Sequence, residues 1–273
     1  HDVARAKKNA DQFSCGTYAS HEEIWKDKSI DAVVICSETN LHKELAIAAA
    51  KAGKHMFIEK PLGFTGKDAF AVARAIEKAG VIFQTGYFNR GVPAHLFLKK
   101  MVDNGSFGKI TRIRHTNCHS GSLGGWFDTE WRWMADPSIA GCGGFGDLGT
   151  HSLDIIMWLM GMPEKVTGDI SVVTGRYGSD CDEAGEAILK FSNGAIGTIA
   201  ASWVDLANPI TCEITGTKAY AYIHYGKLYV KCEGISDGAN PVTDLPAALP
   251  HAFDLFLDAL NGKTVSLVTV AEA

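Results

Sequence analysis

The 273-residue sequence lacks a long hydrophobic run, a paired-cysteine motif and a block of basic residues. Its longest apolar stretch, around residues 155–160, is far shorter than the roughly 20 residues that a membrane-spanning helix needs. Basic and acidic residues number 26 and 31, and the resulting net charge of −5 argues against binding to nucleic acid or to an anionic membrane. With 46% hydrophobic residues, the composition indicates a water-soluble globular protein that has a sizeable core.

The seven cysteines form no CxxC pair, and their odd number leaves at least one without a partner. This usage favours a reducing compartment, so we expect a cytoplasmic protein without disulfides or a zinc finger. The ten histidines show no ligand spacing, and we expect no metal. The sequence also lacks the GxSxG, P-loop and HExxH motifs, and no secretory signal is visible at its start.

The first third of the chain alternates strand and helix patterns. Residues 31–36, 55–58 and 81–85 are short apolar runs that are typical of buried parallel strands. Residues 41–52 and 66–79 have helical composition, and each segment is followed by a glycine. Strands joined by helices of this length predict right-handed crossovers in a parallel sheet. We therefore expect an open α/β domain over residues 1–88.

Beyond residue 85 the pattern changes to consecutive strands. A helix is expected at 93–104, a strand at 109–116, and a second helix at 148–159 after a loop rich in glycine and tryptophan. Further strands are predicted at 166–174, 187–191, 195–202, 210–215, 219–224 and 227–232. Because short turns join them, most neighbours must pair antiparallel. Residues 89–273 are therefore expected to form an α+β domain, whose closing helix at 253–260 begins a segment that packs back on the first domain.

A Glu59-Lys60-Pro61 tripeptide stands where the predicted strand 55–58 leaves the sheet. In an open α/β sheet, the carboxyl ends of the strands line the ligand crevice. Pro61 restrains Lys60 to an extended conformation, so its ammonium and the adjacent carboxylate could orient a substrate hydroxyl and a cofactor ribose. On position alone, a solvated pair that merely ends a strand explains the motif equally well.

The segment GCGGFGDLGTHSLD (residues 141–154) holds a carboxylate and a histidine four residues apart. If the chain is helical by Asp147, this spacing places Asp147 and His151 on one face, within mutual reach. A histidine held by a carboxylate is a proton acceptor near neutral pH, and the preceding glycines would let the backbone approach a ligand closely. Taken alone, a capping Asp147 and a packed His151 explain the segment slightly better, but the Glu-Lys-Pro cluster favours catalysis.

The segment SETNLH (residues 37–42) follows the first predicted strand and opens a helix. Its backbone amides could hold phosphate or ribose oxygens. Ordinary N-capping by Thr39 or Asn40 explains most of the pattern.

Three tryptophans and an arginine crowd the loop after the 109–116 strand, at Trp126, Trp131, Arg132 and Trp133. Exposed aromatic faces suit the C–H faces of sugar rings. Core or interface positions are about twice as common for such tryptophans because their apolar area is large.

The pattern AGKHMFIEKP, followed about eighty residues later by GGFGDLGTHSLD, resembles the glucose–fructose oxidoreductase/inositol dehydrogenase/rhizopine-catabolism (Gfo/Idh/MocA) family over nearly the whole chain. The resemblance implies a Rossmann domain, an α+β domain with an open, mainly antiparallel sheet, and an active site between them. It implies that Lys60, Asp147 and His151 are catalytic, and that the bond between Lys60 and Pro61 is often cis. Expected cofactor contacts are Ser37, Thr39, Asn40, His42, Glu59 and Lys60, and expected substrate contacts are Trp126, Arg132 and Trp133.

The resemblance further implies reversible hydride transfer between NAD or NADP and a sugar, polyol or inositol-like carbinol. His151 would take the hydroxyl proton, Asp147 would hold the imidazole, and Lys60 would hydrogen-bond the reacting oxygen. We expect a homo-oligomer, a dimer or tetramer, joined through the outer face of the second sheet. Two alternatives stay open: an NAD-dependent glycosidase of the same fold, and a non-catalytic sugar or dinucleotide sensor.

The sequence departs from the family at its beginning. The family's opening strand and its G-x-G-x-x-G turn do not occur, and the first residues look like the start of the helix that follows the second strand. We therefore expect the parent polypeptide to be longer by roughly 30–50 residues at its N-terminus, the span of a strand, turn, helix and strand. The family's last helix, expected after residue 272, is absent as well.

Overall fold

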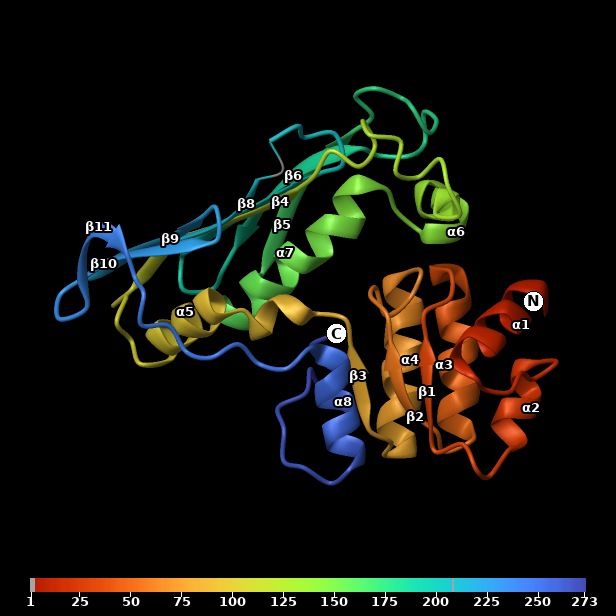
Figure 1. Cartoon of the computed structure of the whole chain (residues 1–273). Helices are drawn as coiled ribbons and strands as arrows, with labels where there is room; N and C mark the ends of the chain where they lie inside the picture. The colour runs from red at the N-terminus through yellow and green to blue at the C-terminus, as the bar shows by residue number, and fades with distance from the viewer. Residues whose placement is uncertain (1–2, 208) are drawn as a thin grey trace.

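The computed structural model describes residues 3–207 and 209–273, and it confirms an α/β domain followed by a domain built on a large sheet (Figure 1). The first domain contains α1 (Val3–Phe13), α2 (His21–Lys26), β1 (Ala32–Ile35), η1 (Thr39–Leu41), α3 (His42–Lys51), β2 (His55–Ile58), α4 (Gly66–Ala79) and β3 (Phe83–Thr85). Its strands form a parallel sheet in the order β1-β2-β3. The three predicted strands and two predicted helices of this region are confirmed.

The alternation of β2 residues explains why this strand is apolar throughout. Met56 and Ile58 pack with residues of α3 and α4, including Ala46 and Val72, on one face of the sheet. Phe57 points to the other face and packs against Phe256 of α8 (Ala252–Leu260). Successive side chains of a strand point to opposite faces, so covering both faces requires a continuous hydrophobic run.

The second domain begins after the short turn η2 (Phe88–Gly91). It contains α5 (Pro93–Asp103), β4 (Ile110–Cys118), η3 (Arg132–Ala135), α6 (Pro137–Ala140) and α7 (Gly144–Met160). The remaining strands are β5 (Lys165–Ser171), β6 (Ala184–Lys190), β7 (Ile196–Ser202), β8 (Ile210–Gly216), β9 (Ala219–His224), β10 (Lys227–Cys232) and β11 (Ser236–Pro241).

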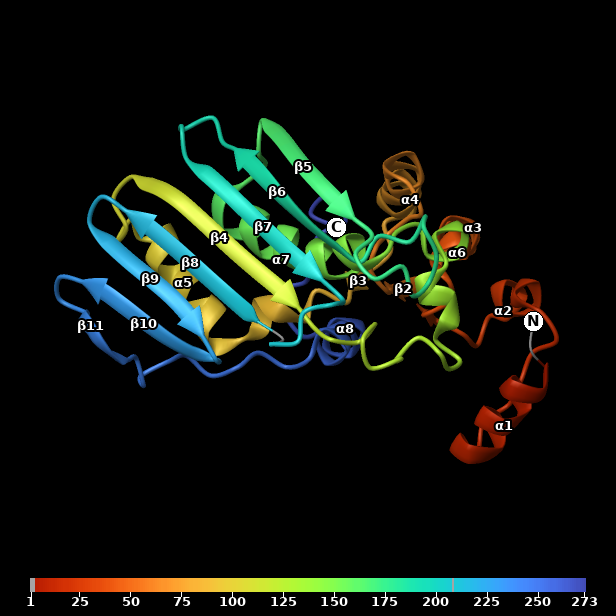
Figure 2. The ribbon, with the colours of Figure 1, turned by 90° about the horizontal axis from the view of Figure 1, so that it is seen from above.

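The eight strands form one sheet in the order β11-β10-β9-β8-β4-β7-β6-β5. Neighbours are antiparallel except β4 and β7, where His115 lies opposite Ile199 in a parallel pair. Helices α5 and α7 lie on one face of this sheet (Figures 1 and 2). Residues such as Leu98, Ile113 and Ile155 form the core between helices and sheet. The largely antiparallel sheet agrees with the sequence prediction.

Several elements differ from the prediction, three of them notably. Strand β5 ends at Ser171 rather than 174 because the backbone N–H groups of Val173 and Thr174 donate to the Glu183 carboxylate instead of to a neighbouring strand. Helix α7 begins at Gly144, four residues earlier than expected. Strand β11 was not predicted, because its sequence SDGANP carries no apolar alternation.

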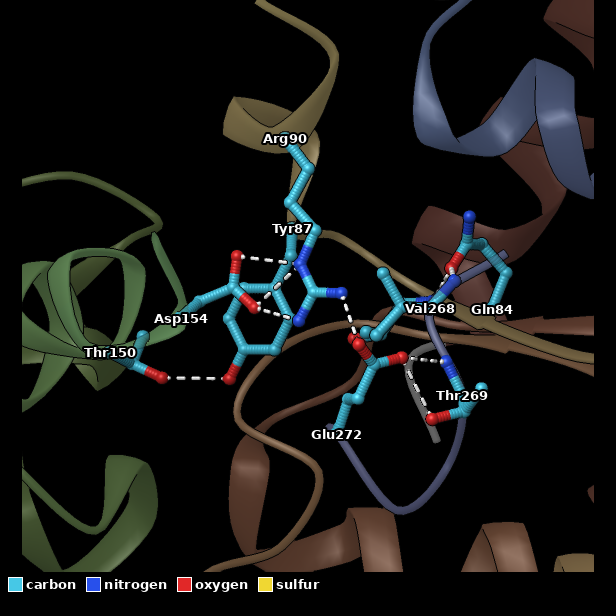
Figure 3. Close-up of polar contacts among 9 residues, drawn as sticks. Gln84, Tyr87, Arg90, Thr150, Asp154, Val268, Thr269 and Glu272 are labelled. Carbon is cyan, nitrogen blue, oxygen red and sulfur yellow. Dashed lines mark hydrogen bonds and ion pairs between the residues drawn. The ribbon is translucent and has the colours of Figure 1, made fainter. Parts of the chain in front are cut away.

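The C-terminal segment returns to the first domain. Helix α8 packs on β2 and β3, and the backbone N–H of Val268 donates to the Gln84 side chain at 3.0 Å (Figure 3). Nearby, Arg90 forms an ion pair with Asp154 of α7 at 2.6 Å and another with Glu272 at 2.9 Å. These contacts fix α7 against the segment that joins the domains.

Within the described residues, no helix combines the length and apolarity that crossing a bilayer would require. The same part of the chain holds no cluster of three or more histidine, cysteine, aspartate or glutamate side chains arranged to bind a metal ion.

Candidate active site

The two motifs that the sequence analysis singled out meet at the interface of the domains. Lys60 lies two residues after the end of β2, and Asp147 lies in the first turn of α7. The Lys60 Nζ donates to Asp147 Oδ1 at 2.6 Å, and the two side chains are only 16% and 14% exposed. The peptide bond between Lys60 and Pro61 is cis. A shielded, charge-assisted hydrogen bond of this length holds the ammonium in a defined position.

The start of α7 is held by the carboxylate of Asp182. Its two oxygens accept from the backbone N–H groups of Gly143 and Phe145, each at 2.7 Å. The N-cap residue is Gly143, and Asp147 sits within the first turn without capping the helix. The expectation that Asp147 is merely a cap is therefore wrong.

The glycines before Asp147 serve a close approach within the chain. A Cβ on Gly143 would lie 2.1 Å from the carbonyl oxygen of Asp182, and one on Gly144 would lie 2.5 Å from that of Glu183. Any larger residue would push the beginning of α7 away from the start of β6. The close approach that the structure shows for Gly143 and Gly144 is to the chain itself, and their approach to a ligand stays a prediction.

The second oxygen of Asp147 accepts from the indole N–H of Trp203 at 3.0 Å. Burial alone would raise the pKa of Asp147, but the charge of Lys60 and hydrogen bonds from Lys60 and Trp203 outweigh it and hold the pKa below its ordinary value. Asp147 is thus a buried carboxylate that stays ionised at neutral pH.

The predicted hydrogen bond between Asp147 and the His151 imidazole is not formed. Both carboxylate oxygens are engaged by Lys60 and Trp203, while Nδ1 of His151 is buried without a partner. The i, i+4 spacing brings the two residues to one face of α7, but the stronger cationic donor comes from the other domain. Asp147 holds the lysine rather than the histidine.

His151 lies one turn after Asp147 and is 7% exposed. Its ring packs against Tyr87 and Phe88, with centroids 6.0 and 5.4 Å away. Burial and the nearby charge of Lys60 lower the pKa of His151 to about 4, although Asp147 acts in the opposite direction. The imidazole is therefore neutral at pH 7 and able to accept a proton.

The carboxyl ends of the three parallel strands form a polar edge beside Lys60. Half-buried Ser37 and exposed Asn40 follow β1, and Glu59 follows β2. After β3, Gly86 lies against the Glu59 side chain: a Cβ there would be 2.6 Å from a carboxylate oxygen of Glu59. The edge brings together the predicted cofactor contacts, apart from two residues.

Those two residues are Thr39 and His42, which are 5% and 1% exposed. The His42 ring nitrogens lie 2.9 Å from the Pro61 carbonyl oxygen and 3.1 Å from that of Ser37. His42 therefore braces the loops after β1 and β2, and its predicted contact with a nucleotide is not supported. Neither Thr39 nor Asn40 caps the helix as predicted. The N-cap residue of α3 is Leu41, and no side chain hydrogen-bonds there.

The predicted substrate loop is partly exposed. Trp126 is 56% exposed, and its ring lies 5.3 Å from that of His119, so it is not the core residue that such tryptophans usually are. Arg132 donates to the Ala135 carbonyl at 2.8 Å, and its guanidinium lies over the Tyr177 ring. Trp133 is half-buried.

The sequence analysis missed two residues of this site, His119 and Trp203. His119 follows β4, and the charges of both Asp147 and Lys60 act on its ring. Trp203 follows β7, at the same end of the sheet, because β4 and β7 run parallel. The one available signal is position: Trp203 stands directly after the predicted strand 195–202, and His119 comes three residues after the predicted strand 109–116.

Two family models match the chain, one in each domain. The model described as an oxidoreductase family with an NAD-binding Rossmann fold matches residues 1–87. The GFO/IDH/MocA C-terminal domain matches residues 95–222.

Curated relatives include sugar and inositol dehydrogenases. Levoglucosan dehydrogenase of Pseudarthrobacter phenanthrenivorans is 32% identical over 74% of this chain and 57% of its own length. Myo-inositol 2-dehydrogenase of Thermotoga maritima is 36% identical over 67% of this chain and 52% of its own length. The matched region thus spans little more than half of these relatives.

Solved structures show the same architecture over almost the whole chain. The complex of levoglucosan dehydrogenase with NADH and levoglucosan aligns with a TM-score of 0.83 and 26% identity, covering 99% of this chain and 82% of that protein. Its complex with NADH alone aligns with a TM-score of 0.84.

Proposed function

The chain belongs to the Gfo/Idh/MocA oxidoreductase family, and from this premise we propose that it transfers a hydride between NAD or NADP and a carbinol carbon of a sugar, polyol or inositol. The observation that carries the proposal is the Lys60–Asp147 ion pair at the domain interface, with the neutral imidazole of His151 one helical turn away. Two of the most similar relatives are named for cyclic substrates of this kind, levoglucosan and myo-inositol.

The polar edge after the parallel strands fits a nicotinamide dinucleotide. Ser37, Asn40 and Glu59 would hold it, because they offer hydroxyl, amide and carboxylate groups at the carboxyl ends of the strands. When bound, the nicotinamide supplies the hydride chemistry.

The side chains handle the proton and the charge of the reacting oxygen. An ammonium group has three donors. Lys60 directs two of them to Asp147, to Oδ1 at 2.6 Å and to the backbone carbonyl oxygen at 3.5 Å, so one remains for a substrate hydroxyl oxygen. The positive Nζ stabilises the negative charge that develops on that oxygen during oxidation. The neutral His151 ring accepts the hydroxyl proton, and in the reverse direction it returns the proton.

The test is a dehydrogenase assay of the full-length protein. NAD and NADP are each offered with a panel of inositols, levoglucosan and open-chain polyols, and reduced cofactor is followed by absorbance. We expect net formation of reduced cofactor with a cyclic polyol, and its loss in the His151→Ala variant.

Two other results would contradict the proposal. Release of a free aglycone from a glycoside without net reduced cofactor would indicate the glycosidase. Binding of sugar and cofactor without any turnover across the panel would indicate a sensor.

We also propose that the protein is a homo-oligomer joined through the bare face of the large sheet. Ile188 and Ile196 point away from the helices and are 56% and 50% exposed. Tyr222 and Tyr229 stack on this face, with centroids 4.7 Å apart. Arg112 and Glu213 lie beside them as an ion pair, so the face offers both charges to a second copy. A partly apolar face with both charges suits a self-complementary contact.

We expect light scattering at micromolar concentration to show a dimer or tetramer. Ile188→Asp should shift the protein toward the monomer, because a charge would be buried in the contact. The matched control is Phe70→Asp, which alters an exposed apolar residue on α4 in the other domain. A wild-type protein that stays monomeric under these conditions would refute the proposal.

A further inference from the structure

Trp203 is fixed from several sides at the end of β7. It is 0% exposed, and its ring centroid lies 4.3 Å from that of Phe127. Its backbone N–H donates to the Glu183 carbonyl at 2.8 Å, and its carbonyl accepts from the N–H of Ser122 at 3.0 Å. A Cβ on Gly144 would lie 3.1 Å from the indole ring, so the beginning of α7 packs closely against it. The indole has little freedom to move.

The only polar atom of this side chain points at the Asp147 carboxylate. The indole N–H donates to Oδ2 at 3.0 Å, while Lys60 donates to Oδ1. An indole N–H is a donor that neither titrates nor accepts, so it can hold the carboxylate in one orientation at every working pH.

We propose that Trp203 is a positioning residue that holds the Asp147 carboxylate toward Lys60 and away from His151. The expected effect of Trp203 on catalysis rests on the proposed function. The hydrogen bond from Trp203 to Asp147 is a feature of the structure and does not depend on that function. Trp203 also connects this pair to the loop that contains Ser122 and Phe127, the loop that carries the exposed Trp126.

Removing the indole N–H would leave a buried acceptor without a partner. Asp147 could then satisfy Oδ2 by rotating toward His151, which lies four residues later on the same helix. Such a rotation takes Oδ1 away from Lys60. The titratable groups whose charges act on Asp147 are Lys60, His119, Cys142 and His151.

The direct test is Trp203→Phe, which keeps an aromatic ring against Phe127 but lacks the N–H. We expect kcat to fall about tenfold, the scale of one hydrogen bond to a charged group, with little change in the KM for cofactor. Because the bond lowers the pKa of Asp147, its loss should raise that pKa and move the acid limb of the rate profile to higher pH.

Trp25→Phe is the matched control. Its indole N–H is buried without a partner in the first domain, so the same substitution removes no hydrogen bond there. We expect unchanged kcat and an unchanged pH profile. An equal loss of kcat in both variants, or a Trp203→Phe profile that coincides with the wild type, would overturn the inference.

A second measurement does not depend on activity. The indole N–H signal of Trp203 in a ¹H–¹⁵N spectrum is identified by its loss in Trp203→Phe. We expect it to shift markedly in Asp147→Asn and to keep its position in Trp25→Phe. If the Trp203 indole signal keeps its position in Asp147→Asn, the hydrogen bond between Trp203 and Asp147 is refuted. If the signal responds but the wild-type protein shows no turnover, the proposed function fails while the hydrogen bond stands.

Discussion

Replacing Lys60 with methionine should lower kcat by about a hundredfold or more, the scale of a positioned group that acts on the reacting atoms. Methionine fills a similar volume but donates no hydrogen bond and carries no charge. Asp147, 14% exposed, would lose its cation at 2.6 Å, and the substrate oxygen would lose its donor. The measurement is steady-state kinetics under conditions where the chemical step limits the rate.

The same variant should change the pH dependence in a defined direction. Lys60 lowers the pKa of His151, so removing its charge raises that pKa from about 4. More of the imidazole is then protonated between pH 5 and 6, and the acid limb of the rate profile moves to higher pH.

Lys43→Met is the matched control, because Lys43 forms an ion pair of 2.7 Å with Asp68 but is 47% exposed. Exposed pairs contribute little to stability, so this variant should keep its turnover. Wild-type kcat in Lys60→Met would remove Lys60 from the mechanism.

Replacing Gly143 with alanine should destabilise the fold by about 3 kcal/mol, the upper range for overpacking. The new Cβ would lie 2.1 Å from the Asp182 carbonyl oxygen, a backbone atom that cannot rotate away. The shift would also strain the hydrogen bond from the Gly143 N–H to the Asp182 carboxylate. Thermal unfolding followed by circular dichroism should show Tm lower by roughly 6–12 °C, since a domain of this size loses about 2–4 °C per kcal/mol.

Gly66→Ala controls for the substitution itself. Gly66 begins α4, and its added Cβ would meet nothing within 4 Å. Alanine there should be neutral or raise Tm slightly, because it restricts the unfolded chain. A Gly143→Ala protein as stable as the wild type would show that the start of α7 can move away from Asp182 freely.

The sequence was a good guide to the elements whose side chains follow a regular period. Strand β2 reads HMFI because Met56 and Ile58 face α3 and α4 while Phe57 faces α8. Strand β11 was missed because its pairing with β10 rests on backbone hydrogen bonds rather than on an apolar face. Likewise, the early end of β5 depends on the carboxylate of Glu183, eight or more residues away along the chain.

For the candidate site, the motifs pointed to Lys60 and Asp147 but missed Trp203, and they did not show how these side chains are paired. Glu59-Lys60-Pro61 and the Asp147–His151 spacing located the ion pair, since both lie at ends of regular elements. The partner of Asp147 could not be read from spacing, because Trp203 and Lys60 reach it only through tertiary packing. His42 is a polar residue of a predicted binding motif whose ring nitrogens instead contact the backbone of the loops after β1 and β2.

Helix α8 lies near the end of the chain but packs on β2 and β3 of the first domain. The first domain therefore cannot complete its folding in the order in which it is synthesised. On the ribosome, Phe57 emerges long before Phe256, the residue that covers it. Until α8 has been synthesised, one face of the parallel sheet is uncovered, and the Gln84 side chain lacks the hydrogen bond that the backbone N–H of Val268 donates to it. The first domain therefore gains its last packing partner only after the second domain has been translated, and until then Phe57 is an apolar surface that a chaperone would shield.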